Sequence, residues 1–160
     1  MNEIFESIIA FLFSVAGFFF VTLPEKAYEC IHFQETISAH HIEKKISSFA
    51  LLGNGTQFSL SECTDFDWDR VYIFLPYTPP DLIEGRIGKK FERSGLIEGS
   101  DTINFLVFLK ANEVVRSSKV RRSFGDFSQK LGAQCFFWTN AIFEIKRPNS
   151  NSWIYIVKGG

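Results

Sequence analysis

The chain has 160 residues, 46% of them hydrophobic and 19 of them Phe, with a formal net charge of −1. This length is typical of one folded domain, and a charge balance near zero gives no support to nucleic-acid binding. Cys30, Cys63 and Cys135 are odd in number and widely spaced, which excludes a disulfide framework; we favour buried free thiols, and a single Cys63–Cys135 bridge is the alternative.

The first feature along the chain is an uncharged run, Ile8 to Leu23, with the sequence IIAFLFSVAGFFFVTL. A membrane helix needs about 20 apolar residues, and the uncharged stretch 7–24 is close to that length. No polar stripe marks one face of the run, as it would in a helix packed on a water-soluble core. We therefore expect a membrane anchor over residues 1–25. One alternative is a cleaved signal peptide, but such a peptide begins with positively charged residues, and this chain has Glu3 and Glu6 there. A second alternative is a helix of the protein core.

Residues 26–160 are predicted to form a single α+β domain, because strand-like and helix-like patterns follow one another with short links. In chain order we expect a helix over 28–49 that ends at Gly53-Asn54-Gly55, strands over 56–62 and 71–76, a helix from 79 to about 90, a hairpin of 103–109 with 113–120, a short helical turn within 125–132, and a hairpin of 141–146 with 152–157. Short links imply a mainly antiparallel sheet, with the two helices packed on one face.

An acidic turn precedes the strand predicted at 71–76. Asp65, Asp67 and Asp69 alternate as at the start of a calcium loop, but Arg70 and Pro76 stand where that loop needs Gly and Glu. No two of the three histidines have the spacing that places two imidazoles on one helical face. We therefore predict no catalytic residue, no metal site and no cofactor. A small hydrolase or metal-dependent enzyme that uses this turn with a histidine is the alternative.

Two groups of side chains are candidates for binding a partner. One is the densest basic stretch together with the Phe that follows it, and the other consists of aromatic residues beside the acidic turn. The candidate partner-binding residues are Arg116, Lys119, Arg121, Arg122 and Phe124 in the first group, and Trp68 and Tyr77 in the second. The basic group could receive an acidic partner, lipid headgroups or nucleic acid. We expect Trp68 to pack in the core and Asp69 to bond backbone groups at the strand start, so that a site here depends on exposed aromatic rings.

The stretch Phe66–Thr78, FDWDRVYIFLPYT, is similar to a block in small bacterial proteins of unassigned function, many of them predicted lipoproteins. The similarity covers roughly residues 56–158 and includes Leu106–Phe108, Gly125–Ser128 and Asn140–Phe143. It implies an envelope-associated α+β domain held outside the cytoplasm, and it supplies no activity. Cys30 lacks the preceding small residues of a lipidation site, so the apolar run would replace the lipid as the anchor.

These observations predict a membrane-tethered binding domain of the bacterial envelope, such as an immunity or inhibitor-type protein, rather than an enzyme. Its partners would be the lipid bilayer, through residues 8–23, and a protein. We expect it at the inner membrane with the domain on the extracytoplasmic side, although Lys26, the basic residue beside the run, would by itself favour the cytoplasmic side. A structural subunit of a membrane complex, packed through Ser14 and Gly17, is a further alternative.

Overall fold

A computed structural model of the chain describes residues 41–127, 135–149 and 151–160. All described residues belong to one compact unit of the chain. The predicted anchor, residues 28–40 of the first predicted helix and most of the turn predicted within 125–132 lie outside the described residues. Among the described helices, none is both long enough and apolar enough to cross a bilayer.

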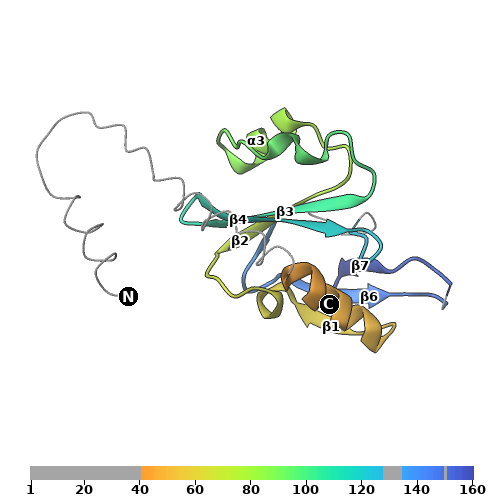
Figure 1. The fold of residues 1–160 in the computed structure, drawn as a ribbon. Helices are drawn as coiled ribbons and strands as arrows, with labels where there is room; N and C mark the ends of the chain where they lie inside the picture. The colour runs from red at the N-terminus through yellow and green to blue at the C-terminus, as the bar shows by residue number, and fades with distance from the viewer. Residues whose placement is uncertain (1–40, 128–134, 150) are drawn as a thin grey trace, which may run out of the picture. The chain divides into compact units, whose positions relative to one another are not determined.

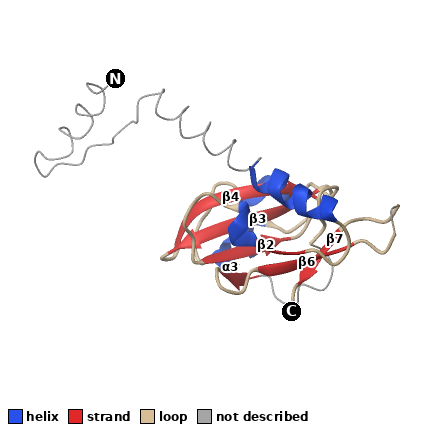
Figure 2. Cartoon of the chain, turned by 90° about the horizontal axis from the view of Figure 1, so that it is seen from below, coloured by secondary structure: helices blue, strands red, loops and turns tan. Residues whose placement is uncertain are grey.

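The described part is an α+β fold with two antiparallel sheets (Figure 1). Its elements are a helix over residues 41–52, β1 (Gln57–Ser59), the 3-10 helix η1 (Leu60–Cys63), β2 (Arg70–Phe74), α3 (Pro80–Ile87), the 3-10 helix η2 (Ser94–Ile97), β3 (Ile103–Lys110), β4 (Glu113–Arg121), β5 (Cys135–Phe137), β6 (Ile142–Lys146) and β7 (Tyr155–Lys158). One sheet has the order β4-β3-β2-β5 and the other β1-β6-β7. The strands are red and the helices blue in Figure 2. The predicted class and the mainly antiparallel pairing are therefore confirmed, whereas β5 and the division into two sheets were not foreseen.

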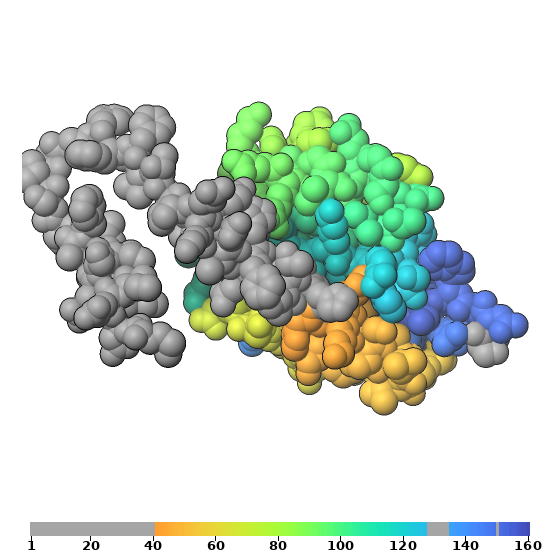
Figure 3. Space-filling view, viewed as in Figure 1, coloured from red at the N-terminus to blue at the C-terminus, as the bar shows by residue number. Residues whose placement is uncertain are grey.

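β3 determines where the two helices lie. All its residues from Asn104 to Leu109 are buried, so the strand needs cover on both faces. Leu106 and Phe108 belong to a core cluster shared with the 41–52 helix and the β1-β6-β7 sheet. Phe105, Val107 and Leu109 belong to a second cluster, shared with α3. The two helices therefore lie on opposite faces of the four-stranded sheet (Figure 1), and the α3 region (green) and the 41–52 helix (orange) show on opposite sides of the surface in Figure 3. The prediction that they share one face is wrong.

The 41–52 helix buries one stripe of side chains. Ile42, Ile46 and Ala50 follow one another at intervals of four residues, and each is at most 3% exposed. The helix ends where predicted, because Gly53 (φ 111°) and Gly55 (φ 87°) adopt left-handed backbone angles that glycine tolerates best.

The strand predicted over 56–62 ends at Ser59 and continues as η1. Ser59 and Glu62 form a capping box: the Ser59 N–H donates to Glu62 Oε2 at 2.9 Å, and the Ser61 N–H donates to Ser59 Oγ at 3.4 Å. These hydrogen bonds to side chains satisfy backbone N–H groups that in a strand would bond to a neighbouring strand. They therefore favour a helical turn. Both predicted hairpins are confirmed, as β3 with β4 and β6 with β7.

β4 and β5 are the outer strands of the four-stranded sheet. At β5 the Phe137 N–H donates to Asn140 Oδ1 at 2.8 Å, and the Phe137 carbonyl accepts the Asn140 N–H at 2.9 Å. At β4 the Arg121 N–H donates to Glu43 Oε1 at 2.9 Å. The end of each outer strand is thus hydrogen-bonded within the domain.

Candidate functional site

The predicted basic group does not form one surface, because successive strand residues point to opposite faces of a sheet. Arg116 pairs in register with Phe108 and lies with its guanidinium 5.1 Å from the Phe66 ring, on the side of the 41–52 helix. Lys119 is exposed and pairs with Phe105, which belongs to the cluster under α3. These two cations therefore lie on different faces of the domain.

Arg121 fastens the 41–52 helix to β4. Its Nε donates to Glu43 Oε1 and its Nη2 to Glu43 Oε2, both at 2.9 Å, and these bonds raise the pKa of Arg121. The guanidinium also lies 4.4 Å from the Phe124 ring. Since Glu43 is only 7% exposed, the arrangement satisfies a carboxylate that the helix brings close to the core. Arg121 and Phe124 thus have a structural task.

The two aromatic candidates lie in opposite environments. Trp68 is 5% exposed, and its Nε1–H donates to Thr64 Oγ1 at 3.0 Å, so it is a core residue as expected and presents no binding surface. Tyr77 is 61% exposed and has a φ of 62°, a value that a bulky side chain rarely adopts. Its N–H donates to the Ile97 carbonyl at 3.1 Å, which holds this backbone conformation in place.

Arg122 connects a buried carboxylate to an exposed aromatic ring. Its Nη2 lies 2.7 Å from Asp126 Oδ2, and Asp126 is 1% exposed. The hydrogen bond to Asp126 raises the pKa of Arg122, and Nη1 donates to the Asp101 carbonyl at 2.9 Å. The same guanidinium lies 5.5 Å from the centre of the Trp153 ring, which is 55% exposed. A cation held at two points therefore supports an indole ring that stands out from the surface.

Asp126 owes its place to backbone pairing with β7. Its N–H donates to the Ile154 carbonyl at 2.9 Å, and its carbonyl accepts the Ile156 N–H at 2.8 Å, so the segment after β4 lies alongside the β1-β6-β7 sheet. This pairing brings Arg122 and Trp153 together. Arg122 was a candidate from the sequence, but Trp153 was assigned to the alternating pattern of a strand over 152–157. The strand begins at Tyr155, which leaves Trp153 in the loop before it.

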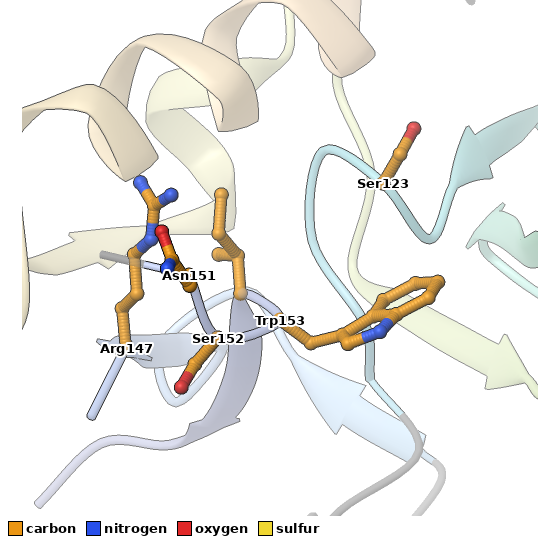
Figure 4. A pocket seen from close by; sticks show the side chains of 6 residues that line it. Ser123, Arg147, Asn151, Ser152 and Trp153 are labelled. Carbon is orange, nitrogen blue, oxygen red and sulfur yellow. The ribbon is translucent and has the colours of Figure 1, made fainter. Parts of the chain in front are cut away.

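A pocket of about 260 Å³ lies beside this ring (Figure 4). We call it the Trp153 pocket, and its lining residues are Ser123, Arg147, Asn151, Ser152, Trp153 and Ile154. In Figure 4, Arg147 and Asn151 lie at one end, with the guanidinium directed toward the 41–52 helix, and the Trp153 ring extends the other way. The Arg147 N–H donates to Asn54 Oδ1 at 2.7 Å, which ties the loop to the turn after the 41–52 helix, and Ser152 Oγ donates to Asn149 Oδ1 at 2.7 Å within the loop itself.

The described residues that line the Trp153 pocket offer a charge, hydrogen-bonding groups and apolar surface. Arg147 supplies a positive charge, Ser123, Asn151 and Ser152 supply polar groups, and Trp153 and Ile154 supply apolar surface. None of these six described residues is a His, Cys, Asp or Glu, the side chains that most often act as a general base or activate a nucleophile.

Two carboxylates of the acidic turn, which the alternative enzyme function would use, are engaged in hydrogen bonds within the fold. Asp67 Oδ2 lies 2.7 Å from Lys110 Nζ, and the hydrogen bond from Lys110 lowers the pKa of Asp67. Asp69 Oδ2 accepts the Ala111 N–H at 2.7 Å, so Asp69 does bond a backbone group, but at the tip of the β3-β4 hairpin rather than at its own strand. Within the residues that the structure describes, no group of three or more His, Cys, Asp or Glu could hold a metal ion. Two of the three histidines, at positions 32 and 40, lie outside the described residues.

Cys63 and Cys135 are free thiols; Cys63 is buried, as favoured from the sequence, whereas Cys135 is only partly buried. Cys63 belongs to the core under the 41–52 helix, and burial raises its pKa to about 12. Cys135 pairs in register with Tyr72, which packs against the other cluster, so the four-stranded sheet separates the two thiols.

Comparison with protein-family models finds no match for this chain, and neither do comparisons with curated proteins and with solved structures. The Trp153 pocket is accordingly interpreted from its own residues.

Proposed function

We propose that this protein is a membrane-tethered binding domain of the bacterial envelope, of the immunity or inhibitor type, and that it recognises a protein partner through Trp153 and the Trp153 pocket. The observation that carries the proposal is the exposed Trp153 ring, 55% accessible and supported by the Arg122 guanidinium at 5.5 Å. Sites of high binding energy in protein interfaces are rich in Trp, Tyr and Arg.

The arrangement lowers the entropic cost of binding. A flexible side chain loses about 0.5–1.5 kcal/mol when an interface immobilises it. Trp153 is already positioned by Arg122, and Arg122 is held by Asp126 and by the Asp101 carbonyl. A partner that stacks on the ring therefore meets a surface whose side chains are ordered in advance.

The support for a membrane tether comes from the amino-acid sequence. Residues 8–23 carry no charge and are close in length to a membrane span, and the similarity of Phe66–Thr78 to envelope lipoproteins favours the outer side of the inner membrane. In this proposal the apolar run holds the domain at the bilayer while the Trp153 pocket faces the partner.

Site-specific photo-crosslinking in the cells that make the protein tests the binding surface. A benzoylphenylalanine at Asn151, an exposed residue of the pocket, should give a discrete adduct of higher mass. Trp153→Ala in the same chain should remove that adduct. The same crosslinker at Leu82, which is 44% exposed on α3 at the opposite face of the four-stranded sheet, is the control and should give none. Identical patterns from both positions would refute recognition through the Trp153 pocket.

Membrane fractionation tests the tether separately. The full-length chain should sediment with membranes and resist alkaline extraction, and a chain that lacks residues 8–23 should be released. Recovery of the intact full-length chain in the supernatant would refute the tether and leave the binding surface untouched.

A further inference from the structure

We infer that the outer face of the 41–52 helix is the surface through which the tethered domain rests on an anionic phospholipid bilayer. The exposed residues of this face, which we call the Leu51 face, are Lys44, Lys45, Ser48, Leu51 and Leu52. The inference rests on the membrane tether of the proposed function, because it specifies how the domain meets the bilayer. None of these residues lines the Trp153 pocket, so the contact uses a surface other than the one proposed for the protein partner.

Apolar surface is concentrated at the end of the Leu51 face. Leu51 is 83% exposed and Leu52 is 74% exposed, which makes them the most exposed large hydrophobic side chains that the structure describes. A single exposed leucine is common on a soluble protein and needs no explanation. Two in succession at the end of a helix offer nearly their whole side-chain surface, and the opposite stripe of the helix already supplies the packing on the core.

Two positive charges lie on the same side of the helix. At 3.6 residues per turn, Lys44 and Lys45 fall with the two leucines within about 120° of the helix circumference, opposite the buried stripe. Within the part of the chain that the structure describes, neither lysine belongs to an ion pair. Their ammonium groups are therefore available to an anionic surface.

The neighbouring acids do not cancel these charges. Glu43 lies toward the core and accepts two hydrogen bonds from the Arg121 side chain. Glu62, in η1, accepts the Ser59 N–H at 2.9 Å. The Leu51 face consequently combines positive charge with apolar side chains.

This combination matches the boundary between lipid headgroups and acyl chains. Binding of a protein surface to that boundary increases with the apolar area buried and with the attraction of basic residues to anionic lipids. Leucine side chains can enter the apolar layer while lysines keep their ammonium groups among the phosphates, since the lysine stem is itself apolar. A protein partner would supply such a layered environment only by a special arrangement of its own side chains.

The length of the chain before the helix favours the bilayer over other occupants. Residues 24–40 separate the apolar run from the helix, and a segment of this length spans at most about 60 Å in any conformation. With the run in the bilayer, the Leu51 face is therefore confined near the lipid surface, and the contact is intramolecular. A short tether gives an effective concentration on the order of millimolar, so that even a small surface is sufficient for contact.

Photo-crosslinking to labelled lipid tests the inference on the full-length chain. The chain with benzoylphenylalanine at Leu52 is reconstituted into vesicles of phosphatidylglycerol with radioactive acyl chains. The two sides of such vesicles have the same lipid, so the direction of insertion does not affect the result. Irradiation should transfer label to the protein. The same crosslinker at Leu82, 44% exposed on α3 at the opposite face of the four-stranded sheet, is the matched control and should give about tenfold less label.

The contribution of charge is measured in the same vesicles. A lysine near an anionic surface favours binding by about fivefold, so Lys44→Gln combined with Lys45→Gln should reduce the label at position 52 by at least about fivefold. Replacement of phosphatidylglycerol by labelled phosphatidylcholine, which has no net charge, should have a similar effect. Arg86→Gln, on the exposed side of α3, is the control for loss of a positive charge and should leave the label unchanged.

Equal labelling from positions 52 and 82, or labelling at position 52 that responds to neither change of charge, would overturn the inference. A protein adduct in place of a lipid adduct at position 52, in the cells that make the protein, would also overturn it and would assign the Leu51 face to a partner or to a second copy of the chain. Alkaline extraction of the vesicles separates the two proposals. Release of the chain refutes the tether and this inference with it, whereas a chain that stays in the vesicles without label at position 52 refutes this inference alone.

Discussion

The most decisive test of the packing concerns Gly125, which follows Phe124 and precedes Asp126. A Cβ added at Gly125 would lie 2.3 Å from Ile156 Cδ1, 3.0 Å from Ile156 Cγ1 and 3.2 Å from Ile46 Cγ2. Carbon atoms in contact are normally separated by about 3.5–4.0 Å. Both isoleucines are 0% exposed, so neither can turn into solvent. Gly125→Ala must therefore strain the core where the 41–52 helix meets β7.

The magnitude follows from two opposing effects. Overpacking of a core lowers the free energy of unfolding by about 1–3 kcal/mol. Replacing Gly by Ala raises it by about 0.4–1 kcal/mol, because Ala restricts the unfolded chain. We expect a net loss of about 1–2 kcal/mol in the free energy of unfolding. Because the closest atom is one methyl group, Ile156→Val, which costs about 0.5–1.5 kcal/mol alone, should relieve most of the clash. The double variant should then be more stable than the sum of the single effects predicts, by about 1 kcal/mol.

Urea denaturation followed by circular dichroism measures all three variants. Gly85→Ala in α3 is the matched control, because a Cβ there meets no atom within 4 Å and glycine is unfavourable inside a helix. It should stabilise the chain by about 1 kcal/mol. If Gly125→Ala is as stable as the unaltered chain, or if its effect and that of Ile156→Val simply add, the close approach described for this site is wrong.

Other predictions address backbone strain, ionisation and the buried ion pair. Tyr77→Gly and Ala111→Gly remove side chains at φ 62° and 49° and should each stabilise the fold by about 0.5 kcal/mol, seen as a higher Tm. The Cys63 thiol has a pKa of about 12 when folded against 9.0 as the ordinary value, so the unfolded state loses its proton first and stability should fall as the pH rises from 9 to 12. In urea denaturation at pH values below and above 9, Cys63→Ala should lack this part of the decline; an unchanged decline would mean that the thiol is not buried. Arg122→Gln takes the cation from buried Asp126 and should cost about 2 kcal/mol, less than the about 3–5 kcal/mol of a fully buried pair, since the Arg122 side chain is 28% exposed. Asp126→Asn added to it should recover part of that loss in the same assay, and full additivity would show that the pair does not interact.

Local patterns were sufficient to predict the hairpins and the end of the 41–52 helix, because alternation and the Gly53-Asn54-Gly55 turn act over a few residues. The strand β5 was missed since three residues carry too short a pattern, and its pairing with β2 is set by distant contacts. The apolar run from Phe105 to Leu109 did hold the information that both faces of β3 are covered, but the prediction used the short links between strands instead.

The candidate site was harder to predict from the sequence than the fold was. Arg122 was identified by its charge, but its role depends on Asp126 and on Trp153, which the pairing of Asp126 with β7 brings into reach. The other basic candidates were expected to act as one group, and the pleat of β4 separates them. Periodicity alone could not distinguish Trp153 as a loop residue from Trp153 as part of the strand predicted over 152–157.

The hydrogen bonds at the end of β5 have a consequence for how copies of this domain behave when they are crowded together. An outer strand with free backbone groups is a template on which a neighbouring chain can add its own strand, and continued addition leads to aggregates. Asn140 occupies both the N–H and the carbonyl of Phe137. A neighbour would have to break two bonds before it could extend the sheet from this side, so exposed Phe137 can remain on the surface without becoming the start of a fibre.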